Sequence, residues 1–336
     1  MKKALIVLLI LAVAGGLFAQ SWSGSVATGA KITFKDDIPV MATADGDDNK
    51  AVKASVNFNN SGDDWGITVS TSAKVDTDNV PSGITIGDMK GWVKFADIFK
   101  LTVGKGIGDA WTTGGNTDAK INSGGNASYR LEITPIDGLN FGFRFAYPDG
   151  KVKASTIGNF FQETGIGAKY TADVWNAATG LELVSEEAGG LDGNWYFGFN
   201  YTGLDIVSIH FGGKANNLFA KKADMDFTLY EKFSGSVAGL GWFVQANEKL
   251  VPDPLTAALS AGVDYGISIS DKASATVGAE VDLTILKDFS FDGWDVFAEL
   301  VYKFNGKVST TAYFEVDGDK DNNITPWLRW TIGFNF

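Results

Sequence analysis

Few residues in this chain have types and spacings that could support catalysis, and the first of them are Ser208 and His210. A serine beside a histidine is the pair from which hydrolases build an activated nucleophile, provided that a third group orients the histidine. His210 is the only histidine of the chain, and we identify no third group for it in the sequence. Val207, Ile209 and Phe211 alternate with the pair, so an extended segment would place the pair on its polar face. We therefore expect no enzyme activity, and we interpret the pair as part of a polar wall.

Two other motifs are of the kinds that bind ions. Asp317, Asp319 and Asp321 stand at alternate positions, as ligands do in a calcium loop, but the Glu expected after such a loop is missing. We favour a solvated acidic loop and leave calcium binding open. The glycines of residues 104–108 are spaced as in a phosphate loop, but no helical pattern follows them, so we expect a loop there. The chain has no Cys, which excludes thiolate ligands and disulfides. The sequence thus predicts no cofactor and no metal.

The elements that position these residues are indicated by the last ten residues of the chain. Apolar and polar side chains alternate there, which is the period of a β-strand with one apolar face. The apolar positions are Leu328, Trp330, Ile332, Phe334 and Phe336. Such a strand needs an apolar environment along its whole length.

The same alternation recurs along the chain after residue 20, and no helical period competes with it. Clear examples are residues 26–34, 52–58, 139–147 and 273–285. Runs of about 9 to 11 residues are long enough to cross a bilayer as tilted strands. The chain is therefore expected to be all-β.

The first 19 residues differ from the rest. Lys2 and Lys3 precede an apolar run from Ala4 to Ala14, which is typical of a secretory signal peptide. We predict cleavage after Ala19, with an N-terminal membrane anchor as the alternative. No later segment approaches the roughly 20 apolar residues of a membrane-spanning helix.

Composition excludes some classes of function. The formal net charge is −12, which disfavours nucleic-acid binding. The chain has 41 Gly, 24 Phe, 10 Trp and 9 Tyr but only 7 Pro, which suits many strands joined by tight turns. Its length would allow two soluble domains, but we find no linker or composition shift, and predict a single domain over residues 20–336.

The spacing of the turns is a second, independent signal, because short and long connections alternate. Short links are expected at Asn305–Gly306, Ser270–Asp271, Ser234–Gly235, 202–205 and 171–173. Longer polar segments lie between them, at 316–323, 287–293, 247–254, 213–224 and 185–193. An outer-membrane barrel has short periplasmic turns and longer outer loops, whereas a soluble sandwich has no reason for this alternation.

The chain resembles bacterial outer-membrane β-barrels, specifically the general porins, from about residue 21 to the end. Members of that superfamily usually end on Phe, with apolar residues at alternate positions before it, as a signal to the barrel-insertion machinery. Phe336, Phe334, Ile332, Trp330 and Leu328 match that pattern. The resemblance implies an antiparallel up-and-down barrel in the outer membrane, in contact with lipid. It also implies a homotrimer.

Counting the alternating runs predicts 18 strands, with 16 as the alternative because residues 84–96 and 148–171 alternate poorly. A barrel of either size is too wide for side chains to fill and encloses an aqueous channel. The longest connection, residues 104–127, is the third outer loop in this count. General porins fold that loop into the lumen, but this chain lacks the family's short acidic-glycine signature, so the position of the loop stays open.

The alternation also predicts which charged residues line the pore, with basic residues mostly in the first half of the chain and acidic residues in the second. The predicted pore-lining residues are Lys31, Lys53, Lys74, Arg130, Arg144, Lys169, Asp264, Glu280, Asp282, Glu299, Glu315 and Arg329. The resemblance implies that facing clusters of opposite charge set a transverse field across the lumen.

The function that these patterns favour is a porin, a water-filled channel for passive diffusion of small hydrophilic solutes and ions. The alternative is a surface-exposed structural or adhesive barrel without an open channel. The sequence does not distinguish which solutes pass.

Overall fold

The structure is a computed structural model. It describes residues 20–34, 40–44, 47–48, 50–76, 81–113, 127–146, 164–185, 191–219, 225–251, 255–286, 289–321 and 323–336. All regular elements in these residues are β-strands of one antiparallel sheet. No helix in the described ranges is both long enough and apolar enough to cross a membrane. The predicted signal peptide, with its cleavage after Ala19, lies outside the described residues.

Most strands are long enough to form the wall of a wide barrel. They are β1 (Gln20–Thr33), β2 (Val40–Ala44), β3 (Asp47–Asp48), β4 (Lys50–Ser61), β5 (Trp65–Asp76), β6 (Pro81–Phe95), β7 (Phe99–Lys105), β8 (Ala127–Ile136), β9 (Leu139–Ala146), β10 (Thr164–Thr171), β11 (Trp175–Ser185), β12 (Leu191–Tyr201), β13 (Ser208–Asn216), β14 (Asp226–Val237), β15 (Leu240–Val251), β16 (Thr256–Ser270), β17 (Ala273–Thr284), β18 (Ser290–Lys303), β19 (Val308–Asp319) and β20 (Ile324–Asn335).

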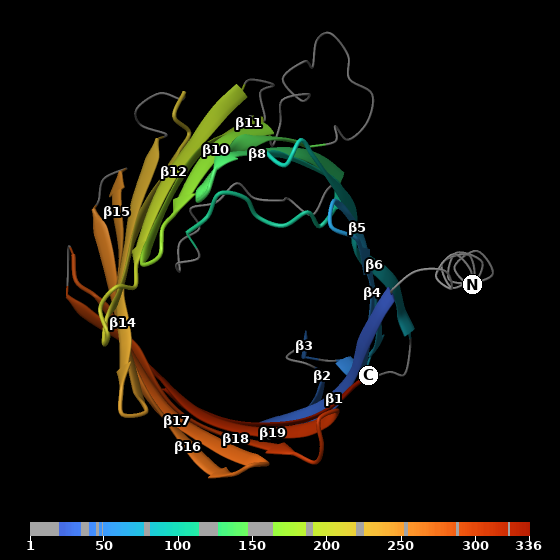
Figure 1. Cartoon of the computed structure of the whole chain (residues 1–336). Helices are drawn as coiled ribbons and strands as arrows, with labels where there is room; N and C mark the ends of the chain where they lie inside the picture. Colours follow the sequence, from blue (N-terminus) through green and yellow to red (C-terminus); the bar gives the residue numbers. More distant parts are fainter. Residues whose placement is uncertain are drawn as a thin grey trace.

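The sheet closes on itself. Each strand from β4 to β20 pairs with the next, and β1 pairs with β20 along one edge and with β4 along the other. The short strands β2 and β3 pair with each other, and β2 pairs with residues 30–32 of β1, so they are not staves of the wall. Figure 1 looks down this ring. The wall therefore has 18 strands, which confirms the predicted count and excludes 16.

Closure of the ring brings the last residue of the chain against the first strand. The Gly24 N–H donates to the Phe336 carbonyl oxygen and the Phe336 N–H donates to the Gly24 carbonyl oxygen, both at 3.0 Å. A Cβ on Gly24 would lie 2.3 Å from the Phe336 ring. Glycine is therefore required at position 24, where the phenyl ring of Phe336 crosses β1.

Strand register sorts the side chains onto two faces. Phe334 lies opposite Val26 and Trp330 opposite Ala30, so the apolar rows of β20 and β1 share one face. That face is the outside of the ring, where Trp330 is 47% exposed and Phe334 is 44% exposed. Large apolar side chains are exposed in the same way on most wall strands, from Trp22 on β1 to Phe314 on β19. The alternation in the sequence thus corresponds to an apolar outer face and a polar inner face.

Three charged residues interrupt the outer face within the described strands. Glu231 on β14 lies opposite Phe211 and Ala246, and Glu248 on β15 lies opposite Leu229. Lys105 is the last residue of β7, at the end that leads into the longest loop. The two glutamates are on neighbouring strands and displaced by two residues, so their side chains are diagonal neighbours.

Short and long connections alternate, but one predicted turn is wrong. Ser234 and Gly235 lie within β14, and the turn to β15 is made by Ala238 and Gly239. Both turn residues have positive φ, 51° and 86°, which is the backbone twist that a two-residue hairpin link requires. Ser-Gly is a common turn signal, whereas alanine rarely adopts this conformation, so the sequence pointed to the wrong pair.

The weak alternation of residues 84–96 has a structural cause. The register of β5 against β6 shifts between Val69 and Thr71 and again between Ala73 and Val75. Beyond each shift, the odd-numbered and even-numbered residues of β6 exchange faces. The period-two pattern therefore breaks, although the pairing of the two strands continues.

Candidate functional site on the inner face of the barrel

The connection after β7 packs against the inner face of the wall. Trp111 and Ile107 are each only 4% exposed and Ala110 is 5% exposed. In Figure 1 the teal segment that follows β7 runs inside the ring, alongside β8 and β10. Residues 106–113, which we name the loop segment, therefore fold into the lumen. The rest of the predicted loop, residues 114–126, lies outside the described residues.

Glycines on the inner face make room for the loop segment. A Cβ on Gly167 of β10 would lie 2.7 Å from the Trp111 ring, and a Cβ on Gly198 of β12 would lie 2.7 Å from Thr113 Oγ1. Trp111 Nε1 also donates a hydrogen bond of 2.8 Å to Asn140 Oδ1 on β9. The inner face of β9, β10 and β12 is thus shaped as a seat for Trp111 and Thr113.

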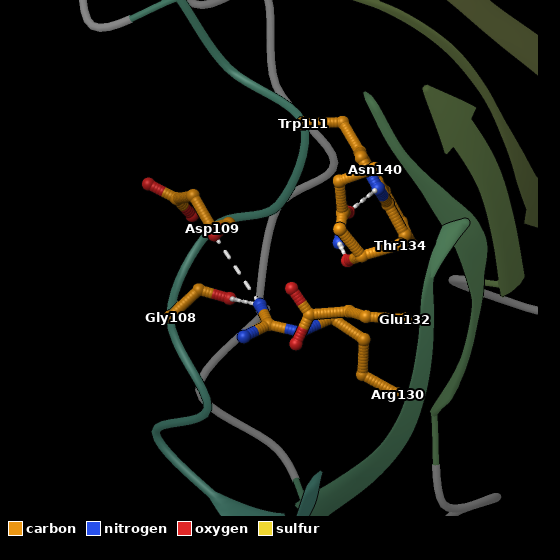
Figure 2. A network of polar contacts seen from close by, with 7 residues as sticks. All are labelled: Gly108, Asp109, Trp111, Arg130, Glu132, Thr134 and Asn140. Atoms are coloured by element: carbon orange, nitrogen blue, oxygen red, sulfur yellow. Dashed lines mark hydrogen bonds and ion pairs between the residues drawn. The ribbon is translucent and has the colours of Figure 1, made fainter. Parts of the chain in front are cut away.

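Two cations hold the backbone of the loop segment. Arg130 Nη1 on β8 donates to the carbonyl oxygens of Gly108 (3.1 Å) and Asp109 (3.3 Å), while its Nε donates to Glu132 at 3.3 Å (Figure 2). Lys90 Nζ on β6 donates to the Gly106 carbonyl oxygen at 2.5 Å. Side chains of the wall thus donate hydrogen bonds to loop carbonyl oxygens that are not paired in the sheet.

A buried ion pair lies on the same side of the inner face. Arg144 Nη1 on β9 is 3.9 Å from Glu182 Oε1 on β11, and both residues lie opposite Gly165 of β10, whose missing side chain lets them meet. Arg144 is 0% exposed and Arg130 is 9% exposed. The alternation predicts both arginines at the open lumen. Their inward direction agrees with that prediction, but both side chains are buried.

The opposite side of the inner face carries carboxylates with no loop above them in the described residues. Glu280, Asp295 and Asp317 lie directly opposite one another on β17, β18 and β19. Asp282 accepts a hydrogen bond from Ser260. The other predicted acidic residues have inward register and remain partly or fully exposed, namely Asp264 on β16, Glu299 on β18 and Glu315 on β19.

Aromatic rings also stand on this inner face, which the sequence analysis did not predict. The Tyr313 ring stacks on Phe297 with centroids 5.7 Å apart and lies 5.1 Å from the Trp327 ring. Arg329 lies over the Tyr313 ring at 5.3 Å, and Lys31 lies over Trp327 at 4.6 Å. These two predicted basic residues therefore border the acidic side through aromatic contacts. These inward aromatic residues could have been predicted from the sequence, because Phe297 and Trp327 occupy inward positions of the alternation.

The remaining predicted residues also have inward register. Lys53 lies opposite Lys74 on β4 and β5, and Lys169 on β10 lies opposite Asn140. All of the predicted residues thus share the inner face, and their role in lining a pore stays a prediction. Ser208 and His210 are inward too, opposite Ser234 and Lys232.

The acidic connection before β20 folds around Asp319. Asp319 Oδ1 accepts the N–H groups of Asp321 and Asn323, both at 2.9 Å, so this carboxylate stabilises a turn. Calcium binding by this segment stays open.

No family model matches the chain, and no curated protein sequence matches it. Solved structures do match. The chain is similar to OpdL of Pseudomonas aeruginosa, with a TM-score of 0.62 and 8% identity over 94% of this chain and 98% of that chain. It is similar to OccAB3 of Acinetobacter baumannii, with a TM-score of 0.56 and 10% identity over 94% and 99% of the two chains.

It is also similar to a loop L8 deletion mutant of OmpT, an outer membrane protein of Vibrio cholerae. That match has a TM-score of 0.51 and 11% identity over 95% of this chain and 99% of that chain. Likeness at such low identity concerns the fold alone. The resemblance predicted from the terminal strand is thereby confirmed at the level of the fold: the chain is a closed, 18-stranded, antiparallel up-and-down β-barrel, similar in fold to these outer-membrane proteins.

Proposed function

We propose that this protein is an outer-membrane porin, a water-filled channel through which small hydrophilic solutes and ions diffuse passively. A barrel of 18 strands encloses more space than its inward side chains fill. The apolar outer face suits contact with lipid, and closure of the sheet leaves no strand edge unpaired in hydrocarbon.

The observation that carries the proposal is the row of Glu280, Asp295 and Asp317. Three carboxylates directly opposite one another on adjacent strands repel each other, and their burial without counter-charges would be costly. Water inside the barrel removes most of that cost, because like charges interact weakly in a high dielectric. A dry or plugged lumen would not tolerate this row.

The loop segment then acts as a constriction. It occupies space on the side of β8 to β12 and leaves the carboxylate side uncovered in the described residues. Solutes would pass between a rigid segment held by Arg130 and Trp111 and a wall of negative charge. Such a passage favours small polar solutes and cations.

Export by a cleaved signal peptide, delivery to the insertion machinery and assembly as a homotrimer belong to this proposal. They rest on the sequence of the N-terminus, on the terminal Phe336 and on the resemblance. The proposal includes no enzyme activity: within the part of the chain that the structure describes, His210 Nδ1 has no hydrogen-bond partner that could orient it.

The test uses the absence of Cys in the chain, since one introduced thiol is then unique. Thr276 on β17 points inward, and its neighbour Val277 is 44% exposed on the outer face. Purified wild-type protein in a planar bilayer should give steady single-channel currents. A charged methanethiosulfonate reagent should change the current of Thr276→Cys in one step and leave Val277→Cys unchanged.

The alternative function predicts a different result. A structural or adhesive barrel would give no steady current, with or without the reagent. An equal response of the two variants would mean that the current does not follow the inner face.

A further inference from the structure

A small pocket lies on the inner face of β13 to β16, away from the loop segment. Polar side chains line it from two neighbouring rows of the sheet. They are His210, Lys232, Gln245 and Ser260 in one row, and Tyr230 and Asn247 in the next. The second row begins with Gly212 and ends with Ala258, which lack long side chains and leave the space open. We name this hollow the wall pocket.

The wall pocket contains a polar atom that the described residues do not satisfy. His210 Nδ1 is buried and has no hydrogen-bond partner among them. A buried nitrogen without a partner costs free energy, which a group donating to it or accepting from it would recover. Because the pocket opens on the lumen, a solute could supply that group.

The charge of the pocket is close to balanced. Lys232 is the cation of the lining, and its Nζ lies 4.8 Å from the Phe243 ring centroid. It also interacts electrostatically with Glu280 on β17. Ser260 donates its hydrogen to Asp282, so another carboxylate borders the pocket. An anionic solute would gain from Lys232 but would be repelled by Glu280 and Asp282.

The uncharged groups of the lining favour a solute with several hydroxyl groups. The side-chain amide of Asn247 presents a donor and an acceptor side by side. Adjacent hydroxyl groups on one carbon skeleton offer the same pair of functions. His210 Nδ1 and the hydroxyl oxygen of Ser260 add groups that both polyols and sugars can engage.

We propose that the wall pocket is a binding site for a neutral polyhydroxylated solute, of the sugar or polyol class. The inference deepens the proposed function and rests on it for access of the solute to the lumen. Weak binding at the wall raises the time that a solute spends inside the channel.

The single histidine provides a direct readout, because protein labelled with ¹⁵N-histidine and carrying no tag gives the two ring-nitrogen signals of one imidazole. Glucose added to the labelled protein in detergent micelles should shift the Nδ1 signal in a saturable way. Sodium acetate, compared with sodium chloride at equal ionic strength, should not. The matched variants are Asn247→Leu in the pocket and Asn57→Leu, which is inward on β4 and far from it along the sheet.

Asn247→Leu should weaken glucose binding by about tenfold or more, the equivalent of one well-placed hydrogen-bonding group, and Asn57→Leu should not change it. If Asn247→Leu does not fold, Ser260→Ala serves in its place. The absence of a saturable glucose shift, a stronger response to acetate, or equal effects of the two asparagine variants would overturn the proposal.

This measurement does not depend on conduction. A protein without channel current that still shows the glucose shift would contradict the porin function but keep the pocket. A conducting protein without the shift would contradict the pocket alone.

Discussion

The inner face of this barrel has two sides that differ in what covers them. On β8 to β12 the loop segment packs against the wall, and Arg144 and Glu182 on the same side are buried as a pair. On β17 to β19 carboxylates stand opposite one another and are only partly buried. The same alternation of residues produces both sides. Burial decides which charges must be paired and which are left to water.

The difference follows from the cost of burying charge. Removing one partner of a buried pair leaves a charge without compensation, whereas solvated charges are nearly independent of one another. We therefore expect substitutions of charge to affect stability on the covered side and ion selectivity on the open side.

The largest expected effect is on the covered side. Replacing Arg144 by Met should lower the free energy of unfolding by about 3–5 kcal/mol, because the buried carboxylate of Glu182 would lose the positive charge beside it. Replacing Arg329 by Met on the open side should cost about 1 kcal/mol, as only its cation–π contacts with Tyr313 and Trp327 are lost. Urea unfolding of both variants in lipid vesicles measures the difference.

The double variant Arg144→Met with Glu182→Met is the control. It should recover most of the lost stability, since apolar residues of similar size often replace a buried pair without cost. Equal losses for Arg144→Met and Arg329→Met would remove the distinction between the two sides.

A second test concerns the seat of the loop segment. Replacing Gly167 by Ala should cost about 1–3 kcal/mol and make the channel current noisier, because the new methyl group displaces Trp111. The matched variant is Gly266→Ala on β16, where a Cβ would have no atom within 4 Å. Its stability and current should match the wild type. Identical behaviour of the two alanine variants would mean that Trp111 is not held by its seat.

A third test concerns selectivity. Replacing Asp295 and Asp317 by Asn removes two fixed negative charges from the open side and should shift the reversal potential in a salt gradient towards anions. Replacing Arg130 and Arg144 by Ser should shift it less, because both side chains are buried. The shift should fade as the screening length falls from about 10 Å at 0.1 M salt to about 3 Å at 1 M. A larger shift for the arginine variant would place the conducting path beneath the loop segment.

The smallest expected effect is on the outer face of the wall, on β14. Replacing Glu231 by Gln should raise the free energy of unfolding in vesicles by about 1 kcal/mol, since a carboxylate facing lipid is costly. The control is Glu299→Gln on the inner face of β18, where water solvates the group and no gain is expected. A loss of stability on Glu231→Gln would indicate that this carboxylate has a binding partner.

Much of the fold could be predicted because period-two alternation is a strong signal. It identified the strands, their inward faces and their number even where bulges in β5 and β6 disturb the pattern. The turn at Ala238 was missed, because left-handed backbone at alanine depends on the twist of the hairpin and not on residue preference. The inward or outward direction of a side chain was therefore predicted correctly where it depends only on adjacent residues in the sequence.

The covered side could not be predicted in the same way. The seat of Trp111 needs Asn140 and Gly167, which come together only through the register of separate strands. No local pattern distinguishes these residues from other inward ones. Glu231 and Glu248, by contrast, break the outer alternation and could have been found from the sequence.

The contact between Gly24 and Phe336 has a consequence for the order of folding. It joins the two most distant parts of the described chain, so the ring closes only after the largest loss of chain entropy, which makes closure a slow step. Until β20 pairs with β1, each of these two strands presents an unpaired edge to other chains. A barrel arrested at that stage is open along one seam and prone to aggregate. The pairing of Phe336 with Gly24 extends the closed seam to the last residue of the chain.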